Sequence, residues 1–469
     1  MMNFALAGIG SGALSALPFD GSRENPLADF SDTPLWLSLV KAVMIFAYLL
    51  VSVLIMIWAE RRLIGRMQQR PGPNRNGPFG LLQSLADGVK SMLKEDVRPK
   101  AADVVVFTLA PMLFAGMAFF AFAIVPLGPD VQMFGHRTPL QLTDIPVAVL
   151  LVLAAAGVAA YGVIMAGWSS GSTYPLLGGL RSSAQIISYE IAMGLALVAV
   201  FLYAGSMSTS QIVAAQAEQG WFIIAAAFSF IVYVITMVGE TNRLPFDLAE
   251  GEGEIVGGYF TEYSGMRFAM FFLAEYINMF TVSAIATTLF LGGWQAPPGI
   301  AAIGGGMFNE GWWGLLWFSL KMWSFMFLFI WLRGSLPRTR YDQFMKFGWK
   351  FLIPASLVWI VLVALVRGAG AGFFGDSVLR IANWTFPVPV LFILGIALLL
   401  LVGAFMLMER AAEQRRAATE GAPPEEIDPF AGGFPIPPLP GQRLVESRAA
   451  HTSSAGTGDD EIVVAGKEN

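Results

Sequence analysis

The residues best suited to chemistry lie in one acidic stretch near the middle of the chain. It reads ETNRLPFDLAEGEGEIVGGYFTEY from residue 240 and has one basic residue, Arg243. Its acidic residues are Glu240, Asp247, Glu250, Glu252, Glu254 and Glu262. Crowded carboxylates shielded from water raise one another's pKa towards neutrality, as proton handling requires. Apolar residues such as Ile255 and Tyr259 lie between the acids, which favours a protein-covered segment over the alternative of a solvated loop.

Four further ionisable residues lie within long apolar stretches: Lys41, Glu190, Glu275 and Lys321. A charge at such a position costs about 2.5–3.5 kcal/mol on membrane-insertion scales, so it normally faces the protein interior and marks a path for ions or protons. We expect the two acids and two lysines to form a proton-accessible array. The alternative is that they form internal ion pairs with only a structural role.

Composition excludes several kinds of chemistry. The 469 residues are 55% hydrophobic and 13% charged, with no cysteine and two histidines, His136 and His451. Disulfides, iron–sulfur clusters and thiolate metal sites therefore cannot form within this chain, and we expect no metal centre. Neither the phosphate-binding loop nor the dinucleotide fingerprint is present, and we expect no nucleic-acid partner.

These acids must be positioned by helices that cross a membrane. A helix of about 20 apolar residues spans the hydrocarbon layer, and backbone groups in lipid must be satisfied within the segment. The sequence predicts an all-α transmembrane bundle of nine spans, at residues 35–59, 103–126, 145–167, 184–204, 221–238, 266–291, 313–332, 349–366 and 388–408.

The basic residues of the loops predict the orientation. Odd-numbered loops contain 17 Lys and Arg residues, if Arg267 is included, and even-numbered loops contain three. Basic residues favour the cytoplasmic side, so we expect a periplasmic N-terminus and, with nine spans, a cytoplasmic C-terminus. We expect residues 1–34 to be a periplasmic segment and not a cleaved signal peptide, because no basic residue precedes Arg23.

The first cytoplasmic loop, residues 60–102, is strongly basic and is called the basic loop below. Apolar residues from Phe79 to Leu93 recur there at steps of three and four, which predicts a surface helix with one apolar stripe. Such a helix either lies on anionic lipid or forms a docking surface for a partner or an amphiphilic substrate. The sequence leaves both interpretations open.

Four motifs in order over residues 35–366 resemble one family, the H-type membrane subunit of respiratory complex I, counterpart of mitochondrial NADH dehydrogenase subunit 1. The first motif is ERRLIGRMQQRPGPNRNGPFGLLQSLADGVKSMLKED from residue 60, and the second is QIISYE, ending at Glu190. The third is the acidic stretch, continued to Gly265 and followed by Ala274-Glu275-Tyr276. The fourth is WLRGSLPRTRYDQFMKFGWK from residue 331.

The resemblance implies a subunit of proton-pumping NADH:quinone oxidoreductase in a bacterial inner membrane. In that family this subunit forms most of the quinone chamber, and its buried acids are thought to begin the proton path. Flavin and iron–sulfur clusters belong to partner subunits, and quinone is a substrate. The resemblance also implies that the peripheral arm docks on loops 60–102, 239–266 and 332–350.

Matched residue by residue, the resemblance assigns two sets of side chains. The proton path comprises Glu190, Glu240, Asp247, Glu250, Glu252, Glu254, Glu262 and Glu275. The quinone chamber comprises Glu60, Arg61, Arg62, Arg243, Arg333, Arg338, Arg340 and Asp342. No catalytic redox residue is expected in this chain.

The chain departs from the family pattern after residue 368. Residues 35–368 make up the eight-helix membrane domain, and residues 369–408 add an extra segment with the ninth helix. Residues 409–469 form a Pro-rich tail that we expect to be disordered. The extra segment has no family role, and we interpret it as a lineage-specific docking element.

Two other functions remain open from the sequence. One is the related membrane subunit of a nickel–iron hydrogenase-type complex. The other is a stand-alone proton-coupled transporter, although no inverted repeat is evident. Carboxylates alone do not distinguish proton from sodium coupling.

Overall fold

The computed structural model describes residues 27–249, 251–300 and 303–370, and four short strands further along the chain. The α-helices are α1 Leu35–Met67, α2 Gln83–Leu93, α3 Val104–Ala123, α4 Ala148–Ser169, α5 Thr173–Ala204, α6 Thr209–Gln219, α7 Phe222–Ala225, α8 Ala227–Glu240, α9 Glu252–Ile255, α10 Gly265–Phe290, α11 Trp313–Ser335, α12 Tyr341–Phe347 and α13 Ile353–Gly370. The 3₁₀ turns are η1 Pro78–Gly80, η2 Gly258–Phe260 and η3 Ile303–Asn309, and η4 Gly348–Leu352 is a π-helical turn.

Strands occur only as short pairs among the described residues. β1 Gly128–Met133 and β2 His136–Leu140 form an antiparallel hairpin in which Val131 lies opposite Thr138. β3 Val378–Ile381 pairs antiparallel with β4 Trp384–Pro387. The chain divides into two units, residues 1–395 and 396–469; the second contains β5 Glu425–Ile427 and β6 Gln442–Leu444, paired in parallel.

Seven described helical segments are long and apolar enough to cross a membrane. They are α1, α3, α4, α5, α10, α11 and the continuous run Tyr341–Arg367 formed by α12, η4 and α13, and α8 is a shorter apolar helix. The predicted all-helical membrane architecture is therefore confirmed for this part of the chain. The predicted ninth helix at 388–408 and the tail from 409 lie almost wholly outside the described residues, as does most of the segment 1–34.

The fifth predicted span is wrong as one continuous helix. Ala226 has φ −113° and ψ 38°, and this non-helical residue separates α7 from α8. The 14 residues of α8 extend only about 21 Å at 1.5 Å per residue, less than the ~30 Å hydrocarbon layer. Glu240, the last residue of α8, is thus carried by a helix too short to span the layer alone.

Several spans are longer than predicted, among them α5, α1 and the run Tyr341–Arg367. α5 begins at Thr173 and has 32 residues, whereas the hydropathy of the sequence suggested a start at residue 184. Small and polar residues in its first turns, such as Gly178 and Arg181, lower the hydropathy without breaking the helix. α1 continues to Met67 and so carries Glu60 within a regular helix.

The central helices approach closely at small residues, as is common in membrane bundles. A Cβ atom added at Gly162 of α4 would lie 3.0 Å from the carbonyl oxygen of Ala110 and from Cβ of Phe114 on α3. At Gly178 of α5 an added Cβ would lie 2.6 Å from the backbone carbonyl carbon of Gly258. The acidic loop, residues 239–266, therefore packs directly against α5.

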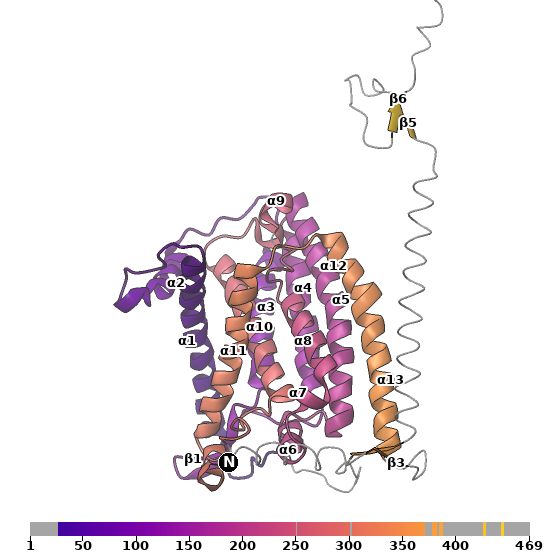
Figure 1. Ribbon diagram of the computed structural model, residues 1–469. Helices are drawn as coiled ribbons and strands as arrows, with labels where there is room; N and C mark the ends of the chain where they lie inside the picture. The colour runs from indigo at the N-terminus through magenta and orange to yellow at the C-terminus, as the bar shows by residue number, and fades with distance from the viewer. Residues whose placement is uncertain are drawn as a thin grey trace, which may run out of the picture. The chain divides into compact units, whose positions relative to one another are not determined.

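The loops at the two ends of the helices differ in character. Figure 1 shows α2, α9 and α12 at one end of the helices, and β1, α6 and α7 at the other. α2 has the predicted apolar stripe, and its residues Leu85, Val89 and Met92 are exposed. The acidic loop and the basic loop thus share one end.

Candidate functional site

The linked buried charges of the site begin with an acid on α1. Glu60 is 5% exposed and forms an ion pair with Arg333 of α11. The hydroxyl of Tyr276 on α10 donates a hydrogen bond to Glu60 Oε2 over 2.5 Å. A buried carboxylate is tolerated only when charges and donors compensate it, so three helices are held together at this acid.

Arg243, from the acidic loop, joins Glu60 to a second buried acid. Its guanidinium lies over the ring of Tyr276, 4.4 Å from the centroid, and its Nη2 lies 3.8 Å from Glu275 Oε2. The residue is 8% exposed and also attracts Glu60 electrostatically. Arg243 therefore interacts with both carboxylates, Glu60 and Glu275. Tyr276 contacts Glu60 through its hydroxyl and Arg243 through its ring.

Glu275 is held from its other side by the acidic loop. The hydroxyl of Tyr259 donates to Glu275 Oε1 over 2.8 Å, and both residues are buried. Tyr259 lies in η2, the turn that packs against Gly178 of α5. The prediction of a protein-covered acidic loop is confirmed at this point, because its apolar residues enter the core beside the acid.

Glu240 and Glu190 form the next pair of acids. Among the described residues Glu240 Oε2 is buried without a hydrogen-bond partner, and its carboxylate interacts electrostatically with that of Glu190 on α5. Gln185, one turn earlier on α5, donates to the carbonyl oxygens of Gly239 and Phe246 over 2.6 and 2.9 Å. Gln185 therefore fixes the end of the helix that carries Glu240.

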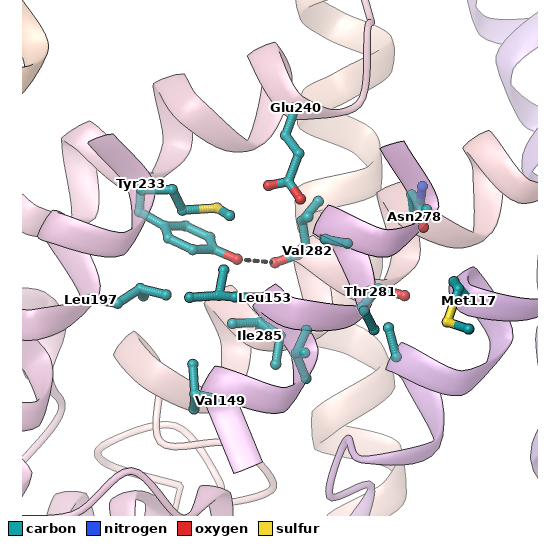
Figure 2. Close-up of a pocket in the computed structure, with 16 residues that line it drawn as sticks. Met117, Val149, Leu153, Leu197, Tyr233, Glu240, Asn278, Thr281, Val282 and Ile285 are labelled. Atoms are coloured by element: carbon teal, nitrogen blue, oxygen red, sulfur yellow. Dashed lines mark hydrogen bonds between the residues drawn. The ribbon is translucent and has the colours of Figure 1, made fainter. Parts of the chain in front are cut away.

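Two small cavities border the carboxylate of Glu240. One, of about 20 Å³, is lined by Glu275 and Asn242 as well as Glu240, and the other, of about 30 Å³, is lined mainly by apolar side chains. Figure 2 shows the Glu240 side chain reaching from the end of α8 into the second cavity, with Asn278 to one side. The structure thus places one water-sized space beside both Glu240 and Glu275.

Glu254 has a different environment from the one that crowding predicted. It forms an ion pair with Arg181, and the side chains are 43% and 31% exposed. The hydrogen bond from Arg181, aided by attraction to Arg338 and Arg340, holds the pKa of Glu254 below its usual value. The raised pKa expected from crowded acids is therefore wrong for this residue, because arginines from two other segments offset the neighbouring charges.

The remaining predicted site residues spread over the end of the molecule. Arg61 pairs with Asp87 of α2 over 2.6 Å, and Arg340 with Asp342 over 3.9 Å, all four exposed. Arg62 lies against Trp58 and Phe79. These contacts hold the surface loops and do not join the buried cluster.

Five other predicted residues belong to the acidic loop or lie beside it. Arg338 is half-buried beside Gly251, and Asp247 and Glu262 are half-buried within the acidic loop. Glu250 lies outside the described residues, and only the backbone of Glu252 is described.

The two membrane lysines do not join the acids. Lys321 donates to the carbonyl oxygens of Leu291, Gly293 and Gln295 over 2.6, 3.0 and 2.6 Å. Lys41 donates to Thr138 Oγ1 over 2.8 Å and to the carbonyl oxygens of Pro139 and Gln141 over 3.3 and 3.2 Å. The predicted array that joins the two lysines to the acids is therefore wrong, and neither lysine forms an ion pair with a residue that the structure describes. Lys321 thus satisfies the carbonyl of the C-cap residue of α10, Leu291, and two carbonyls of the turn that follows the helix.

Sequence reasoning missed the polar residues that connect the acids. Tyr276, Tyr259, Gln185 and Asn242 lie within the quoted motifs, but neither they nor Asn278 were given a connecting role, because they carry no charge. The sequence offered one indication of their role. Tyr276 directly follows Glu275, and Asn278 follows Glu275 by about one helical turn. Among the described residues no group of three or more His, Asp or Glu side chains could hold a metal ion.

The fold and these acids define a multi-pass helical membrane protein with linked buried carboxylates. The family model described as NADH dehydrogenase matches residues 40–364. The H-type subunit of the NADH-quinone oxidoreductase of Streptomyces avermitilis is 55% identical over 421 residues, 89% of this chain and 90% of the relative. Its counterpart in Frankia casuarinae is 62% identical over 353 residues, 75% of this chain and 78% of the relative.

The chain belongs to the family of H-type subunits of NADH-quinone oxidoreductase, the membrane subunits of complex I that correspond to mitochondrial NADH dehydrogenase subunit 1. The predicted family is confirmed, and these matches favour it over the hydrogenase-type and transporter hypotheses. The Streptomyces match is longer than the 368 residues that precede the extra segment, so that relative shares part of the C-terminal extension. This chain contains no cysteine and therefore no iron–sulfur cluster of its own.

Proposed function

We propose that this subunit forms much of the quinone chamber and couples quinone reduction to proton translocation through its buried carboxylates. The observation that carries the proposal is the continuous connection from Glu60 through Tyr276 and Arg243 to Glu275. A change of charge beside Glu60 alters the electrostatic potential at Arg243, which also attracts Glu275. Charge at the chamber end is thereby coupled to the acids further inside.

The positions of the charged residues support different roles for an outer and an inner group. Glu60, Arg243 and Arg333 gather at the end of the bundle that carries the acidic and basic loops, where a quinone head group would meet polar side chains. Glu275, Glu240 and Glu190 continue inwards from that end. Reduction of quinone consumes protons and alters local charge, and the inner acids respond by exchanging protons.

The loops at this end supply the docking surface for the peripheral arm. The exposed Arg61–Asp87 and Arg340–Asp342 pairs lie in the basic loop and in loop 332–350, and Glu254 extends the surface from the acidic loop. The flavin and iron–sulfur subunits dock here, and this end faces the cytoplasm. The isoprenoid tail of the quinone remains in lipid beside the apolar spans.

The proposal is tested in the assembled complex with Glu275→Gln. The substitution removes the titratable group, and the amide can still accept from Tyr259. We expect normal assembly with greatly reduced NADH:quinone reductase turnover and proton translocation. Glu218→Gln, at an exposed acid of α6, is the control, and unchanged coupled activity in Glu275→Gln would contradict the proposal.

The same assay extends to Glu190→Gln and Glu254→Gln, both expected to lower turnover. Repeating it in sodium-free buffer distinguishes the coupling ion, and persistence of pumping there is the result expected for protons. A mild-detergent pull-down through a C-terminal tag should recover flavin and iron–sulfur subunits together with quinone reductase activity. Recovery of a nickel–iron enzyme instead would overturn the assignment of partners.

A further inference from the structure

A hollow runs along α1 where this helix lies beside α11. Its deeper end is a cavity of about 110 Å³, lined by residues of α1, of the β1–β2 hairpin and of the start of α11. Its shallower part is an open groove of about 560 Å³ that follows α1 from Met44 to Ile55, with Trp323 of α11 as the other wall. Met44 and Tyr48 line both parts. The two parts therefore adjoin and are together called the α1–α11 groove below.

The cavity contains a polar group that lacks a partner. Gln141, which follows β2, is 1% exposed, and its Nε2 has no acceptor among the described residues. The lining around it consists mainly of apolar side chains such as Ile45, Leu127 and Leu315. A buried donor without an acceptor is unfavourable. An occupant that brings an oxygen atom to Gln141 is therefore favoured over a purely apolar one.

A buried cation lies at the same place. Lys41 is 4% exposed and lines the cavity. Its ammonium group donates to the neutral oxygens of Thr138, Pro139 and Gln141. A buried charge is normally compensated by an opposite charge, and none of these oxygens carries one. The positive field of Lys41 therefore favours an anionic group near this end of the groove.

Tryptophans mark the membrane level of the cavity. Trp36 of α1, together with Trp312 and Trp313 at the start of α11, is exposed, and exposed tryptophans gather where hydrocarbon meets the lipid head groups. Trp312 also lines the cavity. From Met44 to Ile55 the groove extends about 16 Å along α1, close to half of the ~30 Å hydrocarbon layer. The groove therefore begins at head-group level and has the depth of one leaflet.

We propose that the α1–α11 groove binds one phospholipid of the adjoining leaflet. An acyl chain lies between α1 and α11, an ester carbonyl accepts from Gln141, and the phosphate lies near Lys41. The polar end of this site is at the β1 end of the helices, opposite α2 and α9 (Figure 1). The inference therefore goes beyond the proposed function and does not depend on the acids around Glu60.

The dimensions and the chemistry favour a phospholipid over two other occupants. A transmembrane helix of a partner subunit is about 10 Å wide, so it cannot enter a cavity of about 110 Å³ to reach Gln141. The isoprenoid tail of a quinone fits the groove, but it is a hydrocarbon and has no acceptor for Gln141. A phospholipid has both an apolar chain and an ester oxygen at the depth where Gln141 lies.

Two substitutions remove different parts of the site. Ala47 is exposed and lines the groove, so Ala47→Phe fills the groove with a ring and changes no buried residue. Gln141→Leu keeps the side-chain size and removes the amide donor. Val43→Phe is the control, because Val43 is an exposed residue of the same helix that does not line the groove.

The site is tested by photolabelling of the assembled complex. The complex is stripped of bound lipid in mild detergent and titrated with a phosphatidylglycerol that carries a photoreactive diazirine in one acyl chain. Peptide mass spectrometry then locates the adducts. In the wild type we expect saturable adducts on the groove face of α1, between Met44 and Ile55, and few on the face that carries Val43.

The variants should differ in the concentration of probe that half-saturates the groove adducts. Gln141→Leu should raise this concentration about 10-fold, the factor that corresponds to a lost hydrogen bond of ~1.4 kcal/mol. Ala47→Phe should abolish the groove adducts, and Val43→Phe should match the wild type. If Ala47→Phe does not assemble, the wild-type map and Gln141→Leu decide.

Three results would overturn the proposal. Adducts spread evenly around α1, without saturation, would show bulk lipid only. An equal loss of adducts in Val43→Phe would assign the effect to the packing of α1. The same titration with a quinone that carries the diazirine in its isoprenoid tail tests the other source. Groove labelling by that probe at lower concentration than by phosphatidylglycerol, and unaffected by Gln141→Leu, would assign the groove to the quinone tail.

Discussion

Tyr276 donates its hydroxyl to Glu60 over 2.5 Å, although 216 positions separate the two residues in the sequence. The same tyrosine ring lies under the guanidinium of Arg243. The residue therefore contacts the acid on α1 through its hydroxyl and the cation of the acidic loop through its ring. This double contact makes Tyr276 the first target for mutation.

Tyr276→Phe should separate the two contacts. The ring stays beneath Arg243, but Glu60 loses a buried donor, at a cost of about 1–3 kcal/mol. We expect intact assembly, several-fold lower quinone reductase turnover and unchanged NADH oxidation with an artificial acceptor. Tyr48→Phe, which removes a hydroxyl partnered with Ser319 over 2.9 Å, is the control. Equal turnover in both variants would show that the hydroxyl at Glu60 is dispensable.

The ion pair between Glu254 and Arg181 should respond to acid. Because the pKa of Glu254 is lowered by folding, its stabilisation is present above the unfolded pKa and is lost as pH falls through the folded value. Glu254→Gln should therefore speed amide hydrogen exchange in the acidic loop at pH 7. The difference from wild type should shrink below about pH 4.5, the ordinary carboxyl pKa. A difference that stays constant with pH would contradict this role for the ion pair.

The absence of cysteine allows a direct test of orientation. Gly88 of α2 is exposed, with open space around its Cα, and Glu218 of α6 is exposed at the other end of the bundle. In right-side-out vesicles a membrane-impermeant maleimide should label Glu218→Cys and leave Gly88→Cys unmodified. The reverse pattern would invert the proposed topology.

Lys321 should act on assembly and not on proton movement. Lys321→Met removes the donor to three carbonyl groups, and buried acceptors left without donors cost roughly 1–3 kcal/mol. We expect less assembled complex and a lower thermal midpoint, with an unchanged proton-to-electron ratio in the fraction that assembles. Lys321→Arg should restore part of the yield. A changed ratio at normal yield would return this lysine to the proton path.

The C-terminal extension offers a fifth test. Removing residues 369–469 leaves all the contacts of the buried acids in place, so assembly should suffer more than chemistry. The measurement is the amount of complex on a native gel beside turnover per assembled complex. Lost turnover in fully assembled complex would argue against a docking role.

The helices were largely predictable, because lipid imposes length and hydropathy on each span separately. Eight of the predicted positions coincide with described helices, and the errors arise where local chemistry departs from that rule. Gly178 and Arg181 masked the true start of α5, and the break at Ala226 left no signature in composition. The short helix α8 emerges only when backbone angles are known.

The candidate site was predictable in its charges and not in its connections. Glu60, Arg243 and Glu275 were assigned from motifs, yet nothing in their spacing indicates that Tyr276 bridges them. Such contacts depend on how distant helices are rotated, which the sequence of one chain does not record. The prediction for the lysines was wrong for the same reason. Lys321 donates to backbone carbonyls, whose positions cannot be inferred from residue types.

The length of α1 determines where a bound quinone ring would have to travel. At 1.5 Å per residue its 33 residues extend about 50 Å, well beyond the ~30 Å hydrocarbon layer. Glu60 lies about 38 Å from the start of the helix, and a tilt of about 20° shortens this only slightly. A quinone ring that reaches Glu60 lies outside the hydrocarbon layer, while its long isoprenoid chain still extends back into that layer. In the proposed function the tail would then act as a tether that keeps a water-insoluble substrate from escaping while its head is reduced.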